Sequence, residues 1–242
     1  MELFFAEHFD PKAQTLSVSR EEGGHIYQVL RHRPGELLRL TDGKGHLIEA
    51  EISEFKKGLL RLNFQSARLV PFPEENNLEI GIAIIRPNRL SWAVEKLTEL
   101  GVRKITPLLC QFNSVKHLKE QHLVNVSVSA IKQSRQFYLP EIGEPVDFKD
   151  WLQNSEHCLT LLAHPDSPPA PELRKNIRES APLRVAIGPE GGFAPEELEL
   201  ARSLGIPLLH LGETILRAET AAVAAVSRIK LIRELDSEEK GS

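Results

Sequence analysis

The fold of the larger part of this chain is decided by the stretch Ile187-Gly188-Pro189-Glu190-Gly191-Gly192-Phe193. The mainly apolar run 184–187 predicts a buried strand before the glycines, and Pro195 suits the first turn of a helix after them. Such a turn is typical of an α/β fold, which binds ligands at the carboxyl ends of its strands. The spacing matches neither G-x-G-x-x-G nor G-x-x-x-x-G-K-[ST], which disfavours nucleotide-phosphate binding and leaves either another binding loop or a simple βα turn.

Short apolar runs alternate with helical patterns from residue 78 to the C-terminus. This alternation predicts βαβ units and a mostly parallel sheet covered by helices on both faces. Pro107 lacks the N–H that a strand ladder needs, so we expect the strand 105–109 to be weakened in its first half or to lie at an edge. The other expected strands are 80–85, 159–163, 184–187 and 206–211, and the expected helices are 89–100, 118–134, 171–179, 195–204 and 218–235.

The first 70 residues follow a different pattern, in which short runs of alternating polar and apolar residues lie between turn signals. This pattern predicts a small antiparallel β domain with one short helix over 22–31. Residues 71–77 combine two prolines with charged and amide side chains, which is typical of a stiff, exposed linker. We therefore expect a β-rich domain over 1–70, a linker over 71–77 and an α/β domain over 78–242.

A second loop, 211–217, leads from a predicted strand end into the last helix. Glu219 falls in the first turn of that helix, where a carboxylate suits the positive end of the helix dipole. Large apolar residues in a connection usually line a site, and this loop contains Ile215 and Leu216 beside Arg217. An apolar cleft with backbone amides and a few polar groups suits a planar base with a small polar tail.

The two loops together resemble those of a known family. The second loop contains Leu211-Gly212, followed by Ile215-Leu216-Arg217-Ala218-Glu219-Thr220-Ala221. Combined with 187–193, it closely resembles the ribosomal RNA small-subunit methyltransferase E family, a branch of the SPOUT methyltransferase superfamily. Weaker matches at 25–31, 95–101 and 133–135 extend the resemblance over nearly the whole chain. The chain departs from the family pattern at Asn113, where arginine is frequent, and at Ala218, where threonine is usual.

The resemblance implies methylation of a uridine at N3 in small-subunit (16S) ribosomal RNA, with S-adenosylmethionine as the cofactor. It implies a SPOUT-type α/β domain whose mostly parallel sheet contains a deep trefoil knot that binds this cofactor. It also implies a small N-terminal PUA-like β-barrel that binds RNA. The implied assembly is a homodimer that acts on the assembled 30S subunit and has no association with a membrane.

The resemblance places the cofactor contacts on the loops of the knot, where backbone groups are expected to make most of them. The N3 proton of uridine must leave, so either a general base removes it or a cation stabilises the uridine anion. We expect Arg217 to be that cation, with Arg135 as the second choice, and Glu190 to be either the base or a residue that orders its loop. The expected cofactor-binding residues are Leu162, Ala163, His164, Gly188, Gly191, Gly192, Leu211, Gly212, Ile215 and Leu216.

The charge of the chain is unevenly distributed. The whole sequence contains 30 Lys and Arg against 34 Asp and Glu, a formal net charge of −4 that by itself argues against RNA binding. Residues 86–135, however, contain nine basic and three acidic side chains, a local net charge of +6. Phosphate binding needs only a local basic face, so we expect salt-sensitive RNA binding through this segment. The expected RNA-binding residues are Arg31, Arg86, Arg89, Lys96, Lys116, Gln133 and Arg135.

The sequence also disfavours several other kinds of protein. Cys110 and Cys158 are too few for a disulfide framework and favour a cytoplasmic protein. There is neither a signal-peptide pattern at the N-terminus nor an apolar run long enough to span a membrane. The histidines lack metal-ligand spacing, so no metal site is expected. Trp92 begins an apolar helical stripe and is predicted to be buried.

Two alternative functions and one question about assembly stay open at this point. The chain could be a non-catalytic RNA-binding or ribosome-assembly factor with the same fold, although the intact glycines at 188, 191 and 192 argue against this. It could also be a SPOUT methyltransferase that acts on a ribose 2′-O or on guanosine N1. The apolar stripe of the last helix packs on the sheet or forms part of a dimer interface; its members are Ala222, Ala225, Val226, Ile229 and Ile232.

Overall fold

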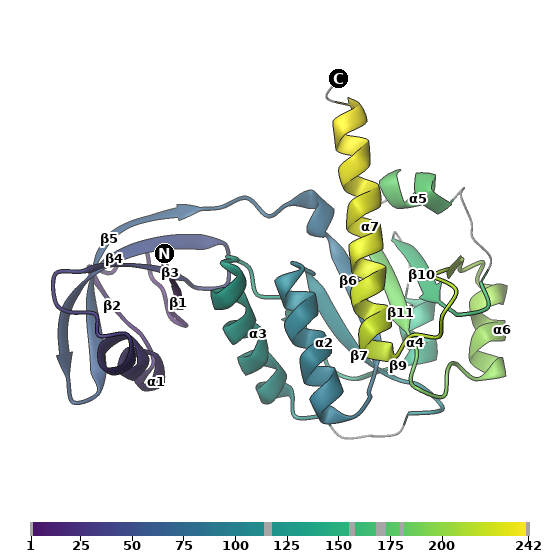
Figure 1. Cartoon of the computed structure of the whole chain (residues 1–242), viewed down its shortest axis with the longest axis horizontal. Helices are drawn as coiled ribbons and strands as arrows, with labels where there is room; N and C mark the ends of the chain where they lie inside the picture. Colours follow the sequence, from purple (N-terminus) through teal and green to yellow (C-terminus); the bar gives the residue numbers. More distant parts are fainter. Residues whose placement is uncertain (1, 114–117, 155–157, 168–172, 180–181, 241–242) are drawn as a thin grey trace. The chain divides into compact units, whose positions relative to one another are not determined.

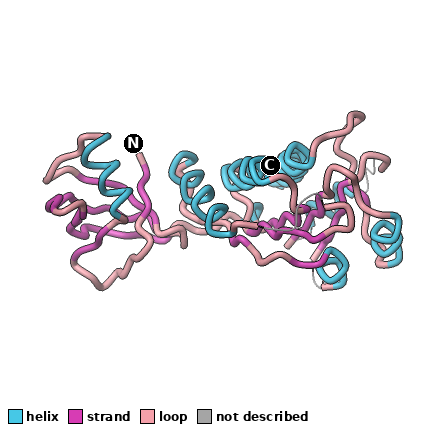
Figure 2. The backbone as a smooth tube through the Cα atoms, turned by 90° about the horizontal axis from the view of Figure 1, so that it is seen from below, coloured by secondary structure: helices cyan, strands magenta, loops and turns pink. Residues whose placement is uncertain are grey.

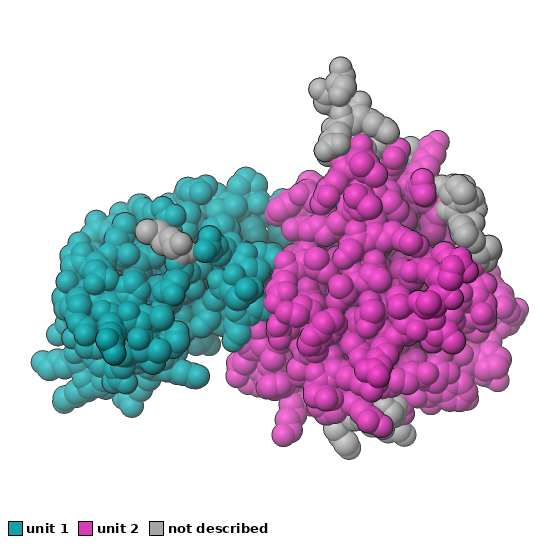
Figure 3. All heavy atoms as spheres, viewed as in Figure 1, with its two compact units in different colours: residues 1–72, 128–139 teal, residues 73–127, 140–242 magenta. Residues whose placement is uncertain are grey.

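The computed structural model describes residues 2–113, 118–154, 158–167, 173–179 and 182–240. The chain forms two compact units, which Figure 3 shows in different colours. Unit 1 comprises Met1–Phe72 and Val128–Leu139, and unit 2 comprises Pro73–Ser127 and Pro140–Ser242. In the described part of the chain, no helix combines the length and the apolar character that crossing a membrane requires.

Unit 1 is built on a five-stranded sheet with the order β1-β3-β4-β5-β2. The long strands β4 (His46–Lys56) and β5 (Leu59–Leu69) form a hairpin. Its turn residues Lys57 and Gly58 both have positive φ angles, as a type I′ turn requires. Every pairing is antiparallel except that of β1 with β3, and the remaining strands are β1 (Leu3–Phe5), β2 (Thr15–Ser17) and β3 (Leu37–Thr41).

The helix expected over 22–31 is present in unit 1 in two pieces. Helix α1 (Arg20–Gly24) begins after Ser19, whose hydroxyl accepts a hydrogen bond from the Glu22 N–H. One π-helical turn, η1 (His25–Val29), follows directly. Soon after this turn, Arg31 has a φ of +63°, which is uncommon for a residue other than glycine. The segment therefore leaves the helix sharply at an arginine.

Unit 2 contains a seven-stranded sheet in which every pairing is parallel. The order is β12-β10-β11-β6-β7-β8, and β9 pairs with β7 beyond the end of β8. This sheet, together with the separate strand sheet of unit 1, confirms the predicted α/β fold class. The strands are β6 (Leu78–Ala83), β7 (Lys104–Leu109), β8 (Glu141–Ile142), β9 (Val146–Asp147), β10 (Leu159–Ala163), β11 (Leu183–Ile187) and β12 (Leu208–Leu209).

The strand that contains Pro107 is not at an edge, contrary to one of the two expectations from the sequence. β7 lies inside the sheet, and Pro107 is in register with Ile82 of β6. On its other side β7 pairs with β8 only at Lys104 and Ile105, and with β9 only at Leu108 and Leu109. Pro107 therefore falls where the outer ladder is interrupted, which is how an interior strand tolerates a proline.

Helices cover both faces of the sheet of unit 2 (Figures 1 and 2). Helices α2 (Pro87–Glu99) and α7 (Ala218–Lys240) lie side by side on one face, and their apolar residues share a core with those of β6 and β11. Helices α4 (Phe148–Gln153) and α6 (Pro195–Ser203) pack on the other face around Phe148 and Phe193. The described residues form two further α-helices, α5 (Leu173–Glu179), in unit 2, and α3 (Glu120–Ser134), of which residues 128–134 belong to unit 1. A short helical turn, η2 (Glu74–Asn76), precedes β6.

The apolar stripe of α7 is used within unit 2 itself. Ala222, Ala225, Val226 and Ile229 are fully buried in the core that α7 shares with α2 and the sheet. The stripe therefore packs on the sheet, which was one of the two uses considered for it. Strand order does not trace how the loops cross, so the trefoil knot stays a prediction.

Candidate active site

A cavity of about 360 Å³ lies in unit 2 at the carboxyl ends of β10, β11 and β12. Three segments enclose it: residues 163–165 after β10, residues 187–193 around the end of β11, and residues within 211–221. Open parallel sheets place their ligands at this end, and sites for small molecules have volumes of roughly 300–1,000 Å³. Most described lining residues are apolar or glycine, so the walls suit a flat, apolar group.

The glycines of the loop after β11 determine its shape. Gly192 has a φ of +73°, and its N–H donates to the Pro189 carbonyl over 2.9 Å, which closes a turn. A Cβ at Gly188 would lie 3.1 Å from the Phe193 ring, so only glycine lets that ring fold so closely under the loop. Phe193 is buried and stacks on Phe148 at a centroid distance of 4.7 Å. The loop is thereby anchored to the core while its glycines line the cavity.

The loop before α7 forms the opposite wall. Gly212 has a φ of +132°, a conformation that side chains disfavour, and no atom lies within 4 Å of the position that a Cβ would take. Ile215 also lines the cavity, yet the residue is 88% exposed. Helix α7 then begins, and the Ala221 N–H donates to the Arg217 carbonyl over 2.8 Å. This wall is therefore an irregular backbone followed by a helix N-terminus.

Arg89 of α2 connects the two loops. Its Nη1 donates to Oε1 of Glu190 over 3.1 Å, and its Nε lies 3.7 Å from Oε1 of Glu219. Glu219 is only 8% exposed, and its Oε2 is buried without a hydrogen-bond partner among the described residues. One guanidinium therefore faces two carboxylates. Arg89 and Glu219 are 130 positions apart in the sequence, so no local pattern indicates this cluster.

The structure brings nearly all of the expected cofactor-binding residues to this one cavity. Leu162 does not line it, because its side chain is fully buried in the core beside α4 and α6, so only its backbone is near this end of the sheet. The expected residues that do line the cavity are Ala163, His164, Gly188, Gly191, Gly192, Leu211, Gly212, Ile215 and Leu216. Their role in binding stays a prediction.

The three expected catalytic residues have different surroundings. Glu190 lines the cavity and is held by Arg89. Arg217 is exposed between the cavity-lining residues Leu216 and Ala218, and its guanidinium makes no hydrogen bond or ion pair with any described residue. Arg135 belongs to unit 1, is exposed, and follows the end of α3 with a φ of +57°.

Some expected RNA-binding residues have side chains exposed to solvent, as phosphate binding requires. Arg86 is exposed at the N-terminus of α2, and its guanidinium has no partner within the described ranges. Arg31 and Gln133 are exposed in unit 1. Lys116 lies outside the described residues.

Other expected RNA-binding residues are already engaged with carboxylates. Lys96 donates to Glu95 over 2.7 Å and to Glu99 over 2.8 Å. These hydrogen bonds, first that to Glu95 and then that to Glu99, raise the pKa of the Lys96 ammonium above its ordinary value. Arg89 likewise faces Glu190 and Glu219. The net charge of +6 counted over residues 86–135 therefore overstates the positive charge that is free to bind phosphate.

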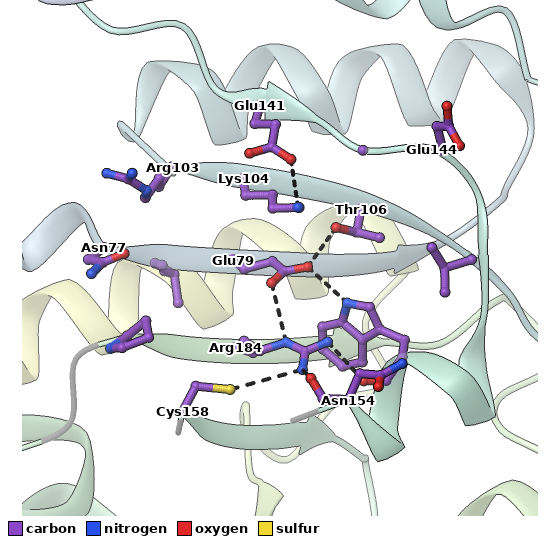
Figure 4. Close-up of a pocket in the computed structure, with 15 residues that line it drawn as sticks. Asn77, Glu79, Arg103, Lys104, Thr106, Glu141, Glu144, Asn154, Cys158 and Arg184 are labelled. Atoms are coloured by element: carbon purple, nitrogen blue, oxygen red, sulfur yellow. Dashed lines mark hydrogen bonds and ion pairs between the residues drawn. The ribbon is translucent and has the colours of Figure 1, made fainter. Parts of the chain in front are cut away.

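A larger cavity, of about 600 Å³, lies near the amino ends of β6, β7 and β11, on the side of α4 (Figure 4). Arg184, only 6% exposed, lies at its base with its guanidinium 3.7 Å from the centre of the Trp151 ring. Its Nη1 donates to the Asn154 carbonyl and its Nη2 to the Trp151 carbonyl, each over 2.9 Å. Its Nε lies 3.3 Å from Oε2 of Glu79.

Glu79 completes this buried network. Its Oε1 accepts hydrogen bonds from Thr106 Oγ1 over 2.6 Å and from Trp151 Nε1 over 2.9 Å (Figure 4). The network thus joins three strands to α4, which gives the buried arginine a structural role. In the ranges that the structure describes, no group of three or more His, Cys, Asp or Glu is placed to hold a metal ion.

Comparison with known proteins identifies the class of this protein. The family model described as an RNA methyltransferase domain matches residues 73–230, and that of an RNA methyltransferase PUA domain matches residues 18–65. The chain is 30% identical, over 86% of each sequence, to ribosomal RNA small subunit methyltransferase E of Rickettsia conorii. The chain belongs to the ribosomal RNA small subunit methyltransferase E family. This confirms the resemblance drawn from the two loops.

Solved structures agree with this assignment. A structure from Legionella pneumophila, described as a methyltransferase in complex with the cofactor SAM, is 29% identical, with a TM-score of 0.81. The match covers 95% of this chain and 96% of that one. A probable rRNA-methyltransferase from Porphyromonas gingivalis is 27% identical, with a TM-score of 0.85, over 97% of this chain and 99% of that one.

Proposed function

We propose that this protein transfers a methyl group from S-adenosylmethionine to N3 of a specific uridine in 16S ribosomal RNA. The observation that carries the proposal is the cavity of about 360 Å³ between the two loops that resemble the family. We assign RNA binding to residues 1–70 and methyl transfer to a knotted domain over 78–242. The proposal includes a cytoplasmic homodimer that acts on the assembled 30S subunit.

The walls of the cavity fit this cofactor in shape and charge. A flat adenine suits apolar walls such as those of Leu211 and Leu216, and the glycine backbone offers N–H and carbonyl groups to its polar edge. Glu190 is the single residue among Asp, Glu, Lys and Arg in the described lining, so the lining favours a cation. S-adenosylmethionine carries a positive sulfonium, whose methyl group is electrophilic when the cofactor is bound.

Arg217 has the surroundings that the reaction needs at the uridine. Holding the cofactor and the uridine in line for transfer lowers the activation free energy by up to roughly 7–11 kcal/mol in favourable cases. Beyond this, the exposed guanidinium of Arg217 can stabilise the negative charge that develops on uridine as the N3 proton leaves. Glu190 is tied to Arg89, so we assign it the ordering of its loop rather than the role of a base. Arg135 stays the second candidate for the cation.

Substitution of Gly192 tests the assignment of the cofactor cavity. A side chain at its φ of +73° strains the loop that lines the cavity. We expect Gly192→Ala to weaken S-adenosylmethionine binding roughly tenfold in a calorimetric titration and to destabilise the protein by about 1–2 kcal/mol. Gly205, at the end of α6, is the matched control, because its φ is +67° and it does not line the cavity. Equal affinities in the two variants would contradict the assignment.

Substitutions of Arg86 and of Lys96 are expected to have different effects on the salt dependence of RNA binding. Arg86 is exposed, whereas Lys96 is held by two carboxylates. We expect Arg86→Ala to reduce the slope of log affinity against log salt by about 1, and Lys96→Ala to change it by much less. Filter binding of 16S RNA over a salt series measures both slopes. The same slope for Arg86→Ala as for the unmodified protein would remove Arg86 from the RNA interface.

The substrate assignment is tested by nucleoside analysis of 16S RNA from a strain that lacks the gene. We expect 3-methyluridine to disappear and to return when the gene is restored. Persistence of 3-methyluridine with loss of a 2′-O-methylated nucleoside or 1-methylguanosine would establish one of the other SPOUT activities. An unchanged nucleoside profile, together with failure to bind S-adenosylmethionine, would instead establish a non-catalytic assembly factor.

A further inference from the structure

A carboxylate beside the proposed cofactor cavity lacks a full counter-charge. Glu219 lies in the first turn of α7, between the cavity-lining residues Ala218 and Ala221. It is 8% exposed, its Oε1 is 3.7 Å from Arg89 Nε, and its buried Oε2 accepts no hydrogen bond from a described residue. A buried carboxylate oxygen ordinarily has a partner, so this atom calls for an explanation.

The charges around Glu219 leave an excess of negative charge. Arg89 is the shared counter-charge of Glu219 and Glu190, so these three side chains together carry a formal charge of −1. The N-terminus of α7 supplies only about half a positive charge. Arg217 is also near in sequence, but its side chain is exposed, so solvent screens its charge far more than that of a buried group. The cluster of Arg89, Glu190 and Glu219, which reaches the cavity through Glu190, therefore keeps an excess of negative charge.

We propose that Glu219 makes this cavity selective for the cationic S-adenosylmethionine over its neutral product, S-adenosylhomocysteine. The inference rests on the proposed function. With its sulfonium, ammonium and carboxylate, S-adenosylmethionine has a net charge of +1. Loss of the methyl group converts the sulfonium into a neutral thioether. This excess of negative charge attracts the first and gains nothing from the second, so it favours exchange of product for fresh cofactor.

In this arrangement Arg89 is a positioning residue, because it holds two carboxylates in place. It contacts one carboxylate from each cofactor loop, Glu190 after β11 and Glu219 at the start of α7. It thus keeps the two carboxylates close to each other, although their like charges repel; of the two, Glu190 lines the cavity and Glu219 lies behind the lining residues Ala218 and Ala221. Full neutralisation would need a second cation, and the described lining of the cavity contains neither Lys nor Arg.

The test is calorimetric binding of S-adenosylmethionine and S-adenosylhomocysteine to the full-length protein and to Glu219→Gln, which keeps the shape of the side chain and removes its charge. We expect the S-adenosylmethionine Kd to rise about tenfold and the S-adenosylhomocysteine Kd to stay within about twofold. Glu190→Gln changes a more exposed carboxylate of the same cluster. We expect it to raise the ratio of the S-adenosylmethionine Kd to the S-adenosylhomocysteine Kd as well, but by a smaller factor. Glu199→Gln removes an exposed charge on α6 and should leave both constants unchanged.

Each other outcome overturns the proposal. A parallel loss of affinity for both ligands would show that Glu219 only supports the structure of the wall. Unchanged affinities for both would show that its charge does not act on the cavity. If Glu219→Gln fails to fold, Glu190→Gln decides, and an unchanged ratio in that variant contradicts the proposal. Absence of binding of either ligand to the unmodified protein would instead refute the proposed function.

Discussion

Replacement of Arg217 by alanine is expected to lower the turnover of methyl transfer by about 10²–10³-fold, as loss of one preorganised group that stabilises an anion typically does. Because Arg217 is exposed and does not line the cofactor cavity, the affinity for S-adenosylmethionine is expected to stay unchanged. Single-turnover transfer of labelled methyl groups to 16S RNA, with cofactor binding measured in parallel, separates the two quantities.

Two further variants test whether the loss of turnover is due to the positive charge at position 217. Arg217→Lys keeps the positive charge and should recover part of the lost turnover. Arg202→Ala removes an exposed arginine of α6 that pairs with Glu199 at 3.3 Å, and it should leave turnover unchanged. Unchanged turnover in Arg217→Ala, or an equal loss in Arg202→Ala, would remove Arg217 from the mechanism.

Replacement of Arg184 by alanine is expected to reduce the free energy of unfolding by roughly 3–5 kcal/mol, because it leaves a largely buried carboxylate without its cation. Glu79 would keep its hydrogen bonds from Thr106 and Trp151 but lose the guanidinium at 3.3 Å. The Trp151 ring would also lose the cation stacked on it. Urea unfolding followed by tryptophan fluorescence measures the change.

A double variant distinguishes the loss of the ion pair from the loss of packing. Glu79→Gln combined with Arg184→Met removes both charges and keeps most of the volume, so it should be more stable than Arg184→Ala. The exposed pair of Arg202 and Glu199 provides the control, since surface ion pairs contribute only about 0–1 kcal/mol. A loss below about 1 kcal/mol for Arg184→Ala would show that the buried network contributes no more than such a surface pair.

The sequence predicted the main strands and helices of unit 2 because their apolar periodicity is strong. β10 has the bounds expected for it, and β6, β7 and β11 lie within two residues of theirs. The strands β8 and β9 have two residues each and α4 has six, lengths at which no periodicity can be recognised. Their places are set by pairing with β7 and by packing of Phe148 and Trp151, which are tertiary effects.

The site was predictable where it depends on backbone and not where it depends on distant side chains. Gly188, Gly192 and Gly212 could be identified because turns and close approaches restrict those positions to glycine. The pairing of Arg89 with Glu219 could not be identified, since only the packing of α2 beside α7 brings them together.

Local pattern was also an unreliable guide to the burial of Trp92 and to the capping of α6. Trp92 is 42% exposed rather than buried, because α2 turns that residue away from the sheet. Ala194 cannot cap α6 with its own side chain, yet the Glu197 carboxylate accepts hydrogen bonds from the N–H groups of Ala194 and Gln111, over 2.7 Å and 2.9 Å. Gln111 is far from Glu197 in the sequence, so its contact with the start of α6 cannot be predicted from the residues around the helix.

The proposed methylation of uridine N3 in small-subunit ribosomal RNA can be tested directly. The most direct measurement incubates the purified protein with S-adenosylmethionine and 30S subunits from a strain that lacks the gene, and then quantifies modified nucleosides by mass spectrometry. We expect 3-methyluridine to form and to approach one per 16S RNA, and Arg217→Ala to form it far more slowly. Formation of a different methylated nucleoside, or of none while the cofactor binds, would contradict the proposal.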